Sequence, residues 1–138
     1  MKIVVDEWEK FTGGALARSG ERLSVTVNPK GVLYLSTAVF KMMGKPEGVQ
    51  MFFNSKRNMI GLKPSSPRLG DAFPVRGKPD GTSHVIHASP FLRHNGISTA
   101  TTERFVEPEM DDNGEMLVLD LTRTVTVRGS TRSKKVLR

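Results

Sequence analysis

Apolar and polar residues alternate along LSVTVNPKGVLYLS, residues 23–36, on both sides of the segment Asn28–Gly31. Alternation with period two is typical of a strand that buries one face, and Asn-Pro-Lys-Gly consists largely of turn-forming residues. The stretch therefore predicts a β-hairpin. A second hairpin is predicted for GVQMFFNSKRNMIGLKP, residues 48–64, because two apolar runs flank the polar residues 54–58.

A short helix is predicted between these two hairpins. In STAVFKMMG, Ser36 or Thr37 can cap the first turn, apolar residues follow at helical spacing, and Gly44 can end the helix. We therefore expect a helix over Thr37–Met43. So short a helix is not stable alone and must pack against other elements.

The same order of elements returns after a connector. Prolines, serines and a glycine in PSSPRLGD predict a linker over residues 65–71. Strand candidates then flank a turn at Lys78–Thr82, and ASPFLRHNG predicts a second short helix over Pro90–Asn95, with Ser89 in the capping position. Another strand pair is expected around the turn sequence Asp111–Gly114. The order strand, strand, helix, strand, strand thus occurs twice.

We interpret this repeated order of elements as an internal duplication, with one unit at residues 23–64 and a second at 72–121. The two helices align Val39 with Phe91, Phe40 with Leu92 and Gly44 with Gly96. A unit of this size cannot enclose a core, so the units should pack on each other, and the apolar helix residues should fill the ends of the shared structure. Hairpins and short helices are common, so a coincidental match in order is the alternative.

The remaining residues form an N-terminal segment, 1–22, and a C-terminal tail, 122–138. Within the tail, TRTVTVRG alternates apolar and polar residues and could form a last strand.

The first unit resembles the AbrB and MazE type of swapped-hairpin domain, also called the SpoVT-AbrB type. The resemblance rests on Gly31 followed by the alternating Val32, Leu33 and Leu35, on a short helix that ends at Gly44, on KPEGV leading into a strand, and on the final IGLKP. In that family two copies, usually from two chains, interleave their hairpins into one small barrel that commonly binds DNA.

The resemblance implies a mainly β fold with short helices, in which two β-β-α-β-β units form a swapped-hairpin-like barrel. One chain would supply both halves, so we expect a monomeric pseudo-dimer or a homodimer. The implied function is non-enzymatic nucleic-acid binding, with DNA favoured over RNA, as a transcriptional regulator or accessory factor. The alternative is a protein-interaction module, such as an antitoxin-like inhibitor or a component of a larger assembly.

Charge is concentrated at the C-terminal end. The 138-residue chain has a formal net charge of +7, yet residues 1–121 hold fifteen Lys and Arg against fourteen Asp and Glu. The last seventeen residues contain six cations and no acid: Arg123, Arg128, Arg132, Lys134, Lys135 and Arg138. A basic tail on a nearly neutral body is suited to phosphate binding, and a solvated terminus that aids solubility is the alternative interpretation.

Eight cations of the body complete the candidate nucleic-acid-binding set. They are Arg18, Arg22, Lys30, Lys41 and Lys45 in and before the first unit, with Arg76, Lys78 and Arg93 as approximate counterparts in the second. Two similar units would present these cations on a pseudo-twofold surface that can meet two phosphate backbones.

Other chemistry has little support in the sequence. The chain has no cysteine, and His84 and His87 should point to opposite faces of a strand because their offset is odd. No nucleophile elbow, phosphate-binding loop or paired catalytic carboxylate is present, so we expect no enzyme activity, no metal site and no cofactor. MKIVVDEWEK fits neither a signal peptide nor a membrane span, which favours a cytoplasmic protein with no membrane partner.

Overall fold

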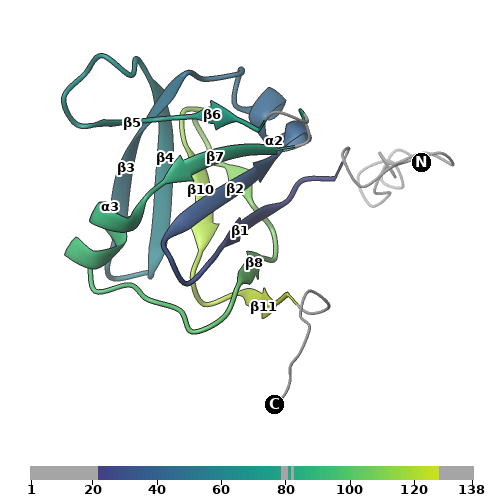
Figure 1. The fold of residues 1–138 in the computed structure, drawn as a ribbon, viewed down its shortest axis with the longest axis vertical. Coiled ribbons are helices and arrows are strands. Elements are labelled where there is room, and N and C mark those ends of the chain that lie inside the picture. The colour runs from purple at the N-terminus through teal and green to yellow at the C-terminus, as the bar shows by residue number, and fades with distance from the viewer. Residues whose placement is uncertain (1–21, 79–80, 82, 128–138) are drawn as a thin grey trace, which may run out of the picture.

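The computed structural model describes residues 22–78, 81 and 83–127, and over these residues the chain is mainly β with two short helices (Figure 1). One antiparallel sheet comprises six strands: β1 Val25–Val27, β2 Val32–Ser36, β6 Arg76–Gly77, β7 Ser83–His87, β8 Glu103–Phe105 and β11 Thr124–Thr126. Their order across the sheet is β11-β8-β1-β2-β7-β6.

The second antiparallel sheet comprises five strands: β3 Gly48–Asn54, β4 Met59–Ser65, β5 Ala72–Pro74, β9 Glu109–Met110 and β10 Leu117–Asp120. Their order is β5-β3-β4-β10-β9. The two helices are α2, Thr37–Met42, and α3, Ser89–His94. Both predicted hairpins of the first unit are confirmed as β1–β2 and β3–β4, and both short helices are confirmed within one residue at each end.

Four adjacent strands of each sheet come as one hairpin from each predicted unit. In the larger sheet β1–β2 and β6–β7 meet along β2 and β7, where Leu33 lies opposite Ile86. In the smaller sheet β3–β4 and β9–β10 meet along β4 and β10, where Gly61 lies opposite Val118. The second strand of each unit's first hairpin, β2 or β7, thus pairs with its counterpart in the other unit. The second strands of the later hairpins, β4 and β10, pair in the same way, as expected if one chain supplies two similar halves. The duplication itself stays a prediction.

Both sheets are open, so the closed barrel implied by the resemblance is not what the strands form. Within the described residues the larger sheet ends at β6 and β11, and the smaller sheet ends at β5 and β9. These edge strands have only two or three residues each, which leaves few backbone groups for a further pairing. The chain does turn from one sheet into the other at Val75, between β5 and β6.

A single apolar core lies between the sheets. The alternate residues that face inward are fully buried, as with Leu33 and Leu35 on β2 or Leu117 and Leu119 on β10. The two helices close this core unequally. Val39 on α2 and Leu92 on α3 are buried, whereas Phe91 is half-buried against the core and Phe40 is half-buried and stacks on His84. The expectation that both apolar residues of each helix fill the interior is thus corrected.

The two helices end in the same way. The amide of Gly44 donates to the Lys41 carbonyl and that of Lys45 to Phe40, at 3.0 and 2.9 Å. In α3 the amides of Gly96 and Ile97 donate to the Arg93 and Leu92 carbonyls, at 3.1 and 2.8 Å. Both glycines have positive φ, at 87° and 68°. These are Schellman-type endings, and they place Lys41 and Arg93 at corresponding positions.

The helix starts differ. Ser36 caps α2, because its Oγ accepts from the Val39 amide at 3.3 Å. In α3 the N-cap residue is Ala88, and no side-chain cap bond is formed. Ser89, expected as the cap, is instead the first helical residue and packs against the β1–β2 turn.

One further strand extends the larger sheet. β11 pairs with β8, which in turn pairs with β1. β11 lies in the segment 122–138, at the alternating residues TRTVTV. The first part of that segment is therefore a sheet edge.

Candidate nucleic-acid interface

Helix α2 joins elements that are far apart in the sequence. Ser36, its cap, also donates from Oγ to the Arg22 carbonyl at 2.7 Å, which holds the chain before β1 beside the helix. Thr37 Oγ1 donates to the Gly81 carbonyl at 3.3 Å, which ties the β6–β7 turn to the same end. Phe40 stacks on His84 of β7, with ring centroids 3.6 Å apart and planes 9° apart.

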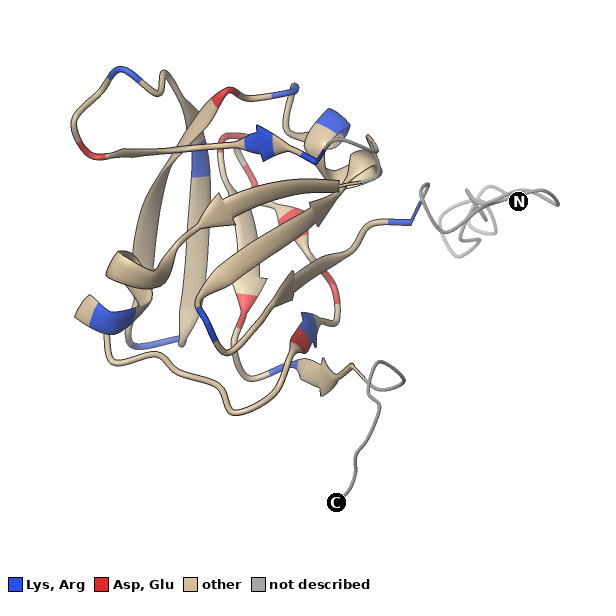
Figure 2. Cartoon of the chain, viewed as in Figure 1, with Lys and Arg blue, Asp and Glu red and all other residues tan. Residues whose placement is uncertain are grey.

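Five of the predicted nucleic-acid-binding residues gather around α2 because of these contacts. All five are exposed, and Figure 2 shows them around the end of the larger sheet where α2 and β6 lie. We call them the α2 cation cluster: Arg22, Lys41, Lys45, Arg76 and Lys78.

No carboxylate of the described residues forms an ion pair with this cluster. Among the described residues the one ion pair joins Arg123 to Glu107, at 3.1 Å. Lys78 places its ammonium 5.6 Å from the centre of the Tyr34 ring, a cation–π contact that keeps its charge. Most acids of the described residues lie on the segment from β8 to β10. The cluster can therefore attract phosphate groups.

The other candidates are placed elsewhere. Lys30 and Arg93 line a pocket between the β1–β2 turn and α3. Arg123 carries a paired charge, as just described. Six candidates lie outside the described residues: Arg18, Arg128, Arg132, Lys134, Lys135 and Arg138. The structure thus brings together one cation before β1, one on α2, one after α2, one on β6 and one in the β6–β7 turn, but not Lys30 or Arg93.

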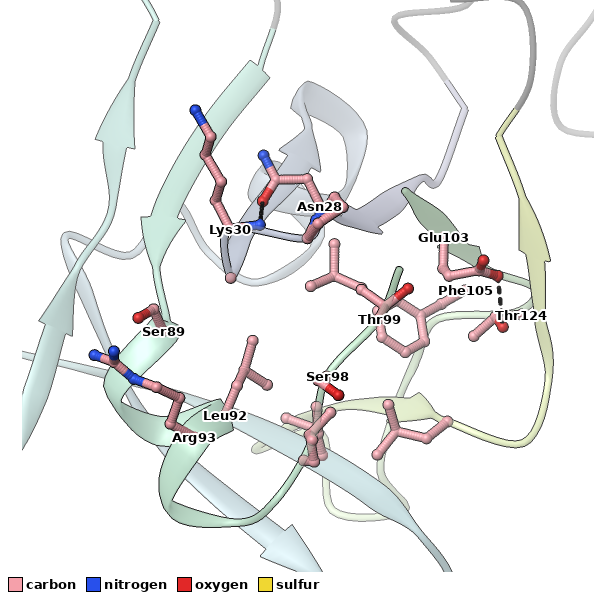
Figure 3. Close-up of a pocket in the computed structure, with 16 residues that line it drawn as sticks. Asn28, Lys30, Ser89, Leu92, Arg93, Ser98, Thr99, Glu103, Phe105 and Thr124 are labelled. Carbon is pink, nitrogen blue, oxygen red and sulfur yellow. Dashed lines mark hydrogen bonds between the residues drawn. The ribbon is translucent and has the colours of Figure 1, made fainter. Parts of the chain in front are cut away.

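The pocket has a volume of about 430 Å³ and is shown in Figure 3. Its apolar wall includes Leu92 of α3 and Phe105 of β8. Its polar groups are Lys30 and Arg93 on one side, the hydroxyls of Ser98 and Thr99 on the α3–β8 loop, and Glu103 on the other side. No sequence pattern indicated this site, because its walls come from both units.

The histidines do not assemble into a site. His84 is half-buried, and its Nδ1 is buried without a hydrogen-bond partner in the described part of the chain. Burial lowers the pKa of His84 below its usual value, so the ring is neutral at pH 7. His87 and His94 are exposed. No group of three or more His, Asp or Glu among the described residues is arranged to hold a metal ion.

Several exposed residues were missed by sequence reasoning. Lys56 and Arg57 lie in the β3–β4 turn, Lys63 on β4 and Arg104 on β8. Tyr34 was also missed, although its position beside a predicted hairpin turn could have suggested a role for its ring. A count of charges along the chain does not reveal which of them share a surface.

The chain has no significant match among protein-family models, curated proteins or solved structures. The resemblance to the AbrB type therefore stays a prediction. In the part of the chain that the structure describes, no helix is long and apolar enough to cross a membrane.

Proposed function

We propose that this chain binds nucleic acid, DNA in preference to RNA, as a non-enzymatic transcriptional regulator or accessory factor in the cytoplasm. The observation that carries the proposal is the α2 cation cluster, five exposed cations from distant segments that have no carboxylate at ion-pair distance among the described residues. Neutralised phosphates release counterions, so such a cluster gains affinity without needing a deep cleft. Phosphate contacts of this kind fix position, and base contacts would add sequence preference.

The proposal includes the architecture implied by the resemblance. Two AbrB-like units would act as a pseudo-dimer within one chain. The matching helix endings at Gly44 and Gly96 support this, as does the pairing of β2 with β7 and of β4 with β10.

The test is duplex DNA binding, measured by fluorescence anisotropy across a salt series. A triple variant, Lys41→Gln, Lys45→Gln and Arg76→Gln, removes three cations of the cluster. The matched control, Lys56→Gln, Arg57→Gln and Lys63→Gln, removes the same charge from the smaller sheet and its turn. Each phosphate contact contributes about −0.9 to the slope of log affinity against log salt concentration. This slope should therefore become shallower by about 2.7 in the first variant and change little in the control.

Equal changes in both variants would show that net charge, and not the cluster, governs binding. If the intact protein shows no salt-sensitive affinity for DNA, the nucleic-acid proposal fails. A matched RNA duplex in the same assay distinguishes the two nucleic acids.

A protein partner is the second candidate, favoured by the outer face of the smaller sheet. Phe52 is 46% exposed there, beside Val118 and above Gly61, in a hollow of about 160 Å³. Phe52→Ser should leave the affinity for DNA unchanged if that face serves a protein partner instead.

A further inference from the structure

The pocket between the β1–β2 turn and α3 is built by contacts between the two units. The Ala88 amide donates to the Gly31 carbonyl at 2.9 Å, and the backbone of Gly31 approaches Ser89 too closely for any side chain to stand between them. On the other side of the opening, the α3–β8 loop carries Ser98 and Thr99 (Figure 3). The pocket therefore lies between fixed elements.

Its inner surface is apolar and comes from both sheets. The apolar lining residues are Val27, Ile60, Leu92, Ile97, Phe105 and Leu121. Four of them are buried in the core, and Ile97 and Leu121 are partly buried against it, so packing holds the surface that faces the opening. A volume of about 430 Å³ falls in the range of sites for small molecules, roughly 300 to 1,000 Å³.

The polar groups of the pocket have opposite signs on opposite sides. Lys30 and Arg93 rise from the same side of the pocket, one on each side of Ser89, and their exposed charged ends point outward from it (Figure 3). The turn that carries Lys30 is held by Asn28, whose Oδ1 accepts from the Lys30 and Val32 amides, each at 3.0 Å. Neither cation has a carboxylate at ion-pair distance in the described part of the chain.

Glu103 occupies the far side with its acceptor capacity largely used. Its carboxylate accepts from the hydroxyls of Thr101, Thr126 and Thr124, at 2.5, 2.9 and 3.0 Å. These bonds, the one from Thr101 first, lower the pKa of Glu103, so the group is anionic at neutral pH. An anionic ligand group is thus repelled at this side and attracted at the other.

We propose that this pocket binds a small amphipathic anion, with its carboxylate or phosphate at the edge formed by Lys30 and Arg93 and its apolar body against Leu92 and Phe105. The site is separate from the α2 cation cluster, so the inference goes beyond the proposed function. It assigns to Lys30 and Arg93 a role in ligand binding that differs from the phosphate contacts predicted from the sequence.

The test uses the full chain and four probes of one apolar length, each below its critical micelle concentration. Octanoate and octyl phosphate carry the anion, octan-1-ol is neutral, and octylammonium has the opposite charge. Amide chemical shifts followed by NMR give both the site and the affinity. Octanoate should shift the amides of Gly31, Ser98 and Thr99, and octan-1-ol should bind about tenfold more weakly because it lacks the charge-assisted bonds. The two anionic probes distinguish a carboxylate from a phosphate ligand.

Two variants and one control assign the anion contact. Lys30→Met and Arg93→Met should each weaken octanoate binding several-fold and reduce its advantage over octan-1-ol. Lys41→Met, at the position of α2 that corresponds to Arg93, should leave both affinities unchanged. All three positions are exposed, so the fold should be retained, and unchanged shifts away from the pocket check this.

Three outcomes overturn the inference. Equal affinities for octanoate and octan-1-ol would show that Lys30 and Arg93 do not bind the anionic group. Chemical-shift changes centred on Gly61 and Val118 would show that the probes bind the outer face of the smaller sheet and not the pocket. Absence of saturable shifts with either anion would show that the pocket takes no such ligand.

Discussion

At the scale of single residues, the β1–β2 turn shows what a local pattern predicts and what it does not. The sequence Asn-Pro-Lys-Gly predicts the turn, and the Gly31 amide does donate to the Asn28 carbonyl at 3.0 Å. The contact of Gly31 with Ser89 was not predictable. It depends on which helix lies over the turn, and that is decided by the pairing of β2 with β7.

Gly31→Ala should destabilise the fold for two reasons. Gly31 has a φ of 85°, which costs an L residue about 1 to 2 kcal/mol, and an added Cβ would lie 2.7 Å from the Cβ of Ser89. Equilibrium denaturation should therefore give a loss of at least that size. Gly70→Ala is the control, because a Cβ there meets nothing within 4 Å and φ is not positive. Equal losses for the two variants would contradict the close approach.

His84 should make stability depend on pH. Its pKa is lowered in the folded state by burial, so the unfolded chain binds the proton more readily as pH falls below about 6.5. The melting temperature should therefore fall between about pH 7.5 and pH 5. His84→Phe keeps a ring against Phe40 and should flatten this dependence, whereas His94→Gln, at an exposed site, should not.

The carboxylates respond in a different pH range. Hydrogen bonds, chiefly from the Glu115 amide to Asp111 and from the Thr122 hydroxyl to Asp120, lower the pKa of both groups. The contribution of these two carboxylates to folding stability is present at neutral pH and is lost only as pH falls below about 4. A pH dependence above pH 5 that survives in His84→Phe would mean that another group titrates there.

At the scale of elements, periodicity located the hairpins and short helices but not the partners of each strand. Alternation identified β2 because that strand has one face in the core, and continuous apolar runs identified β4 and β10. β8 and β11 are short strands with polar threonines and charges, so their pairing depends on tertiary contacts that no local pattern contains.

The buried helix residues should carry most of the contribution of α2 and α3 to stability. Leu92 is 5% exposed, so Leu92→Ala should cost about 2 to 5 kcal/mol in denaturant unfolding, as expected for a cavity left in a packed core. Val39→Ala, at a fully buried but smaller side chain, should cost less. The control is His94→Ala on the exposed side of α3, which should stay within about 0.5 kcal/mol. A loss at Leu92 no larger than at His94 would place α3 outside the core.

At the scale of the whole molecule, each sheet is completed by strands from both predicted units. This arrangement explains why neither the pocket nor the α2 cation cluster follows from the sequence of one unit. The β6–β7 turn beside Lys78 is tied to α2 only because β7 lies beside β2, and Lys30 lines the same pocket as Arg93 because of the same pairing. The candidate residues were predictable by type and approximate position, but their division between two surfaces required the topology.

The same arrangement predicts how the molecule responds to division in the segment between β4 and β5. A fragment ending at Ser66 would expose the backbone of β2 and β4, and a fragment starting at Pro67 would expose β7 and β10. Each would also lack half of the core, so each alone should be insoluble or should self-associate along these edges. Mixing the two should restore one native complex, seen as the dispersed amide spectrum of the intact chain and the mass of one copy of each fragment.

A charge placed where β2 pairs with β7 provides the control. Leu33→Asp in the first fragment places an acid at a fully buried position opposite Ile86, where it should prevent both self-association and complementation. Lys63→Asp, on an exposed residue of β4, should allow both. A first or second fragment that folds as a stable monomer would show that its hairpins form a core without the other half. The two units would then be independent domains, and the pseudo-dimer would have no structural basis.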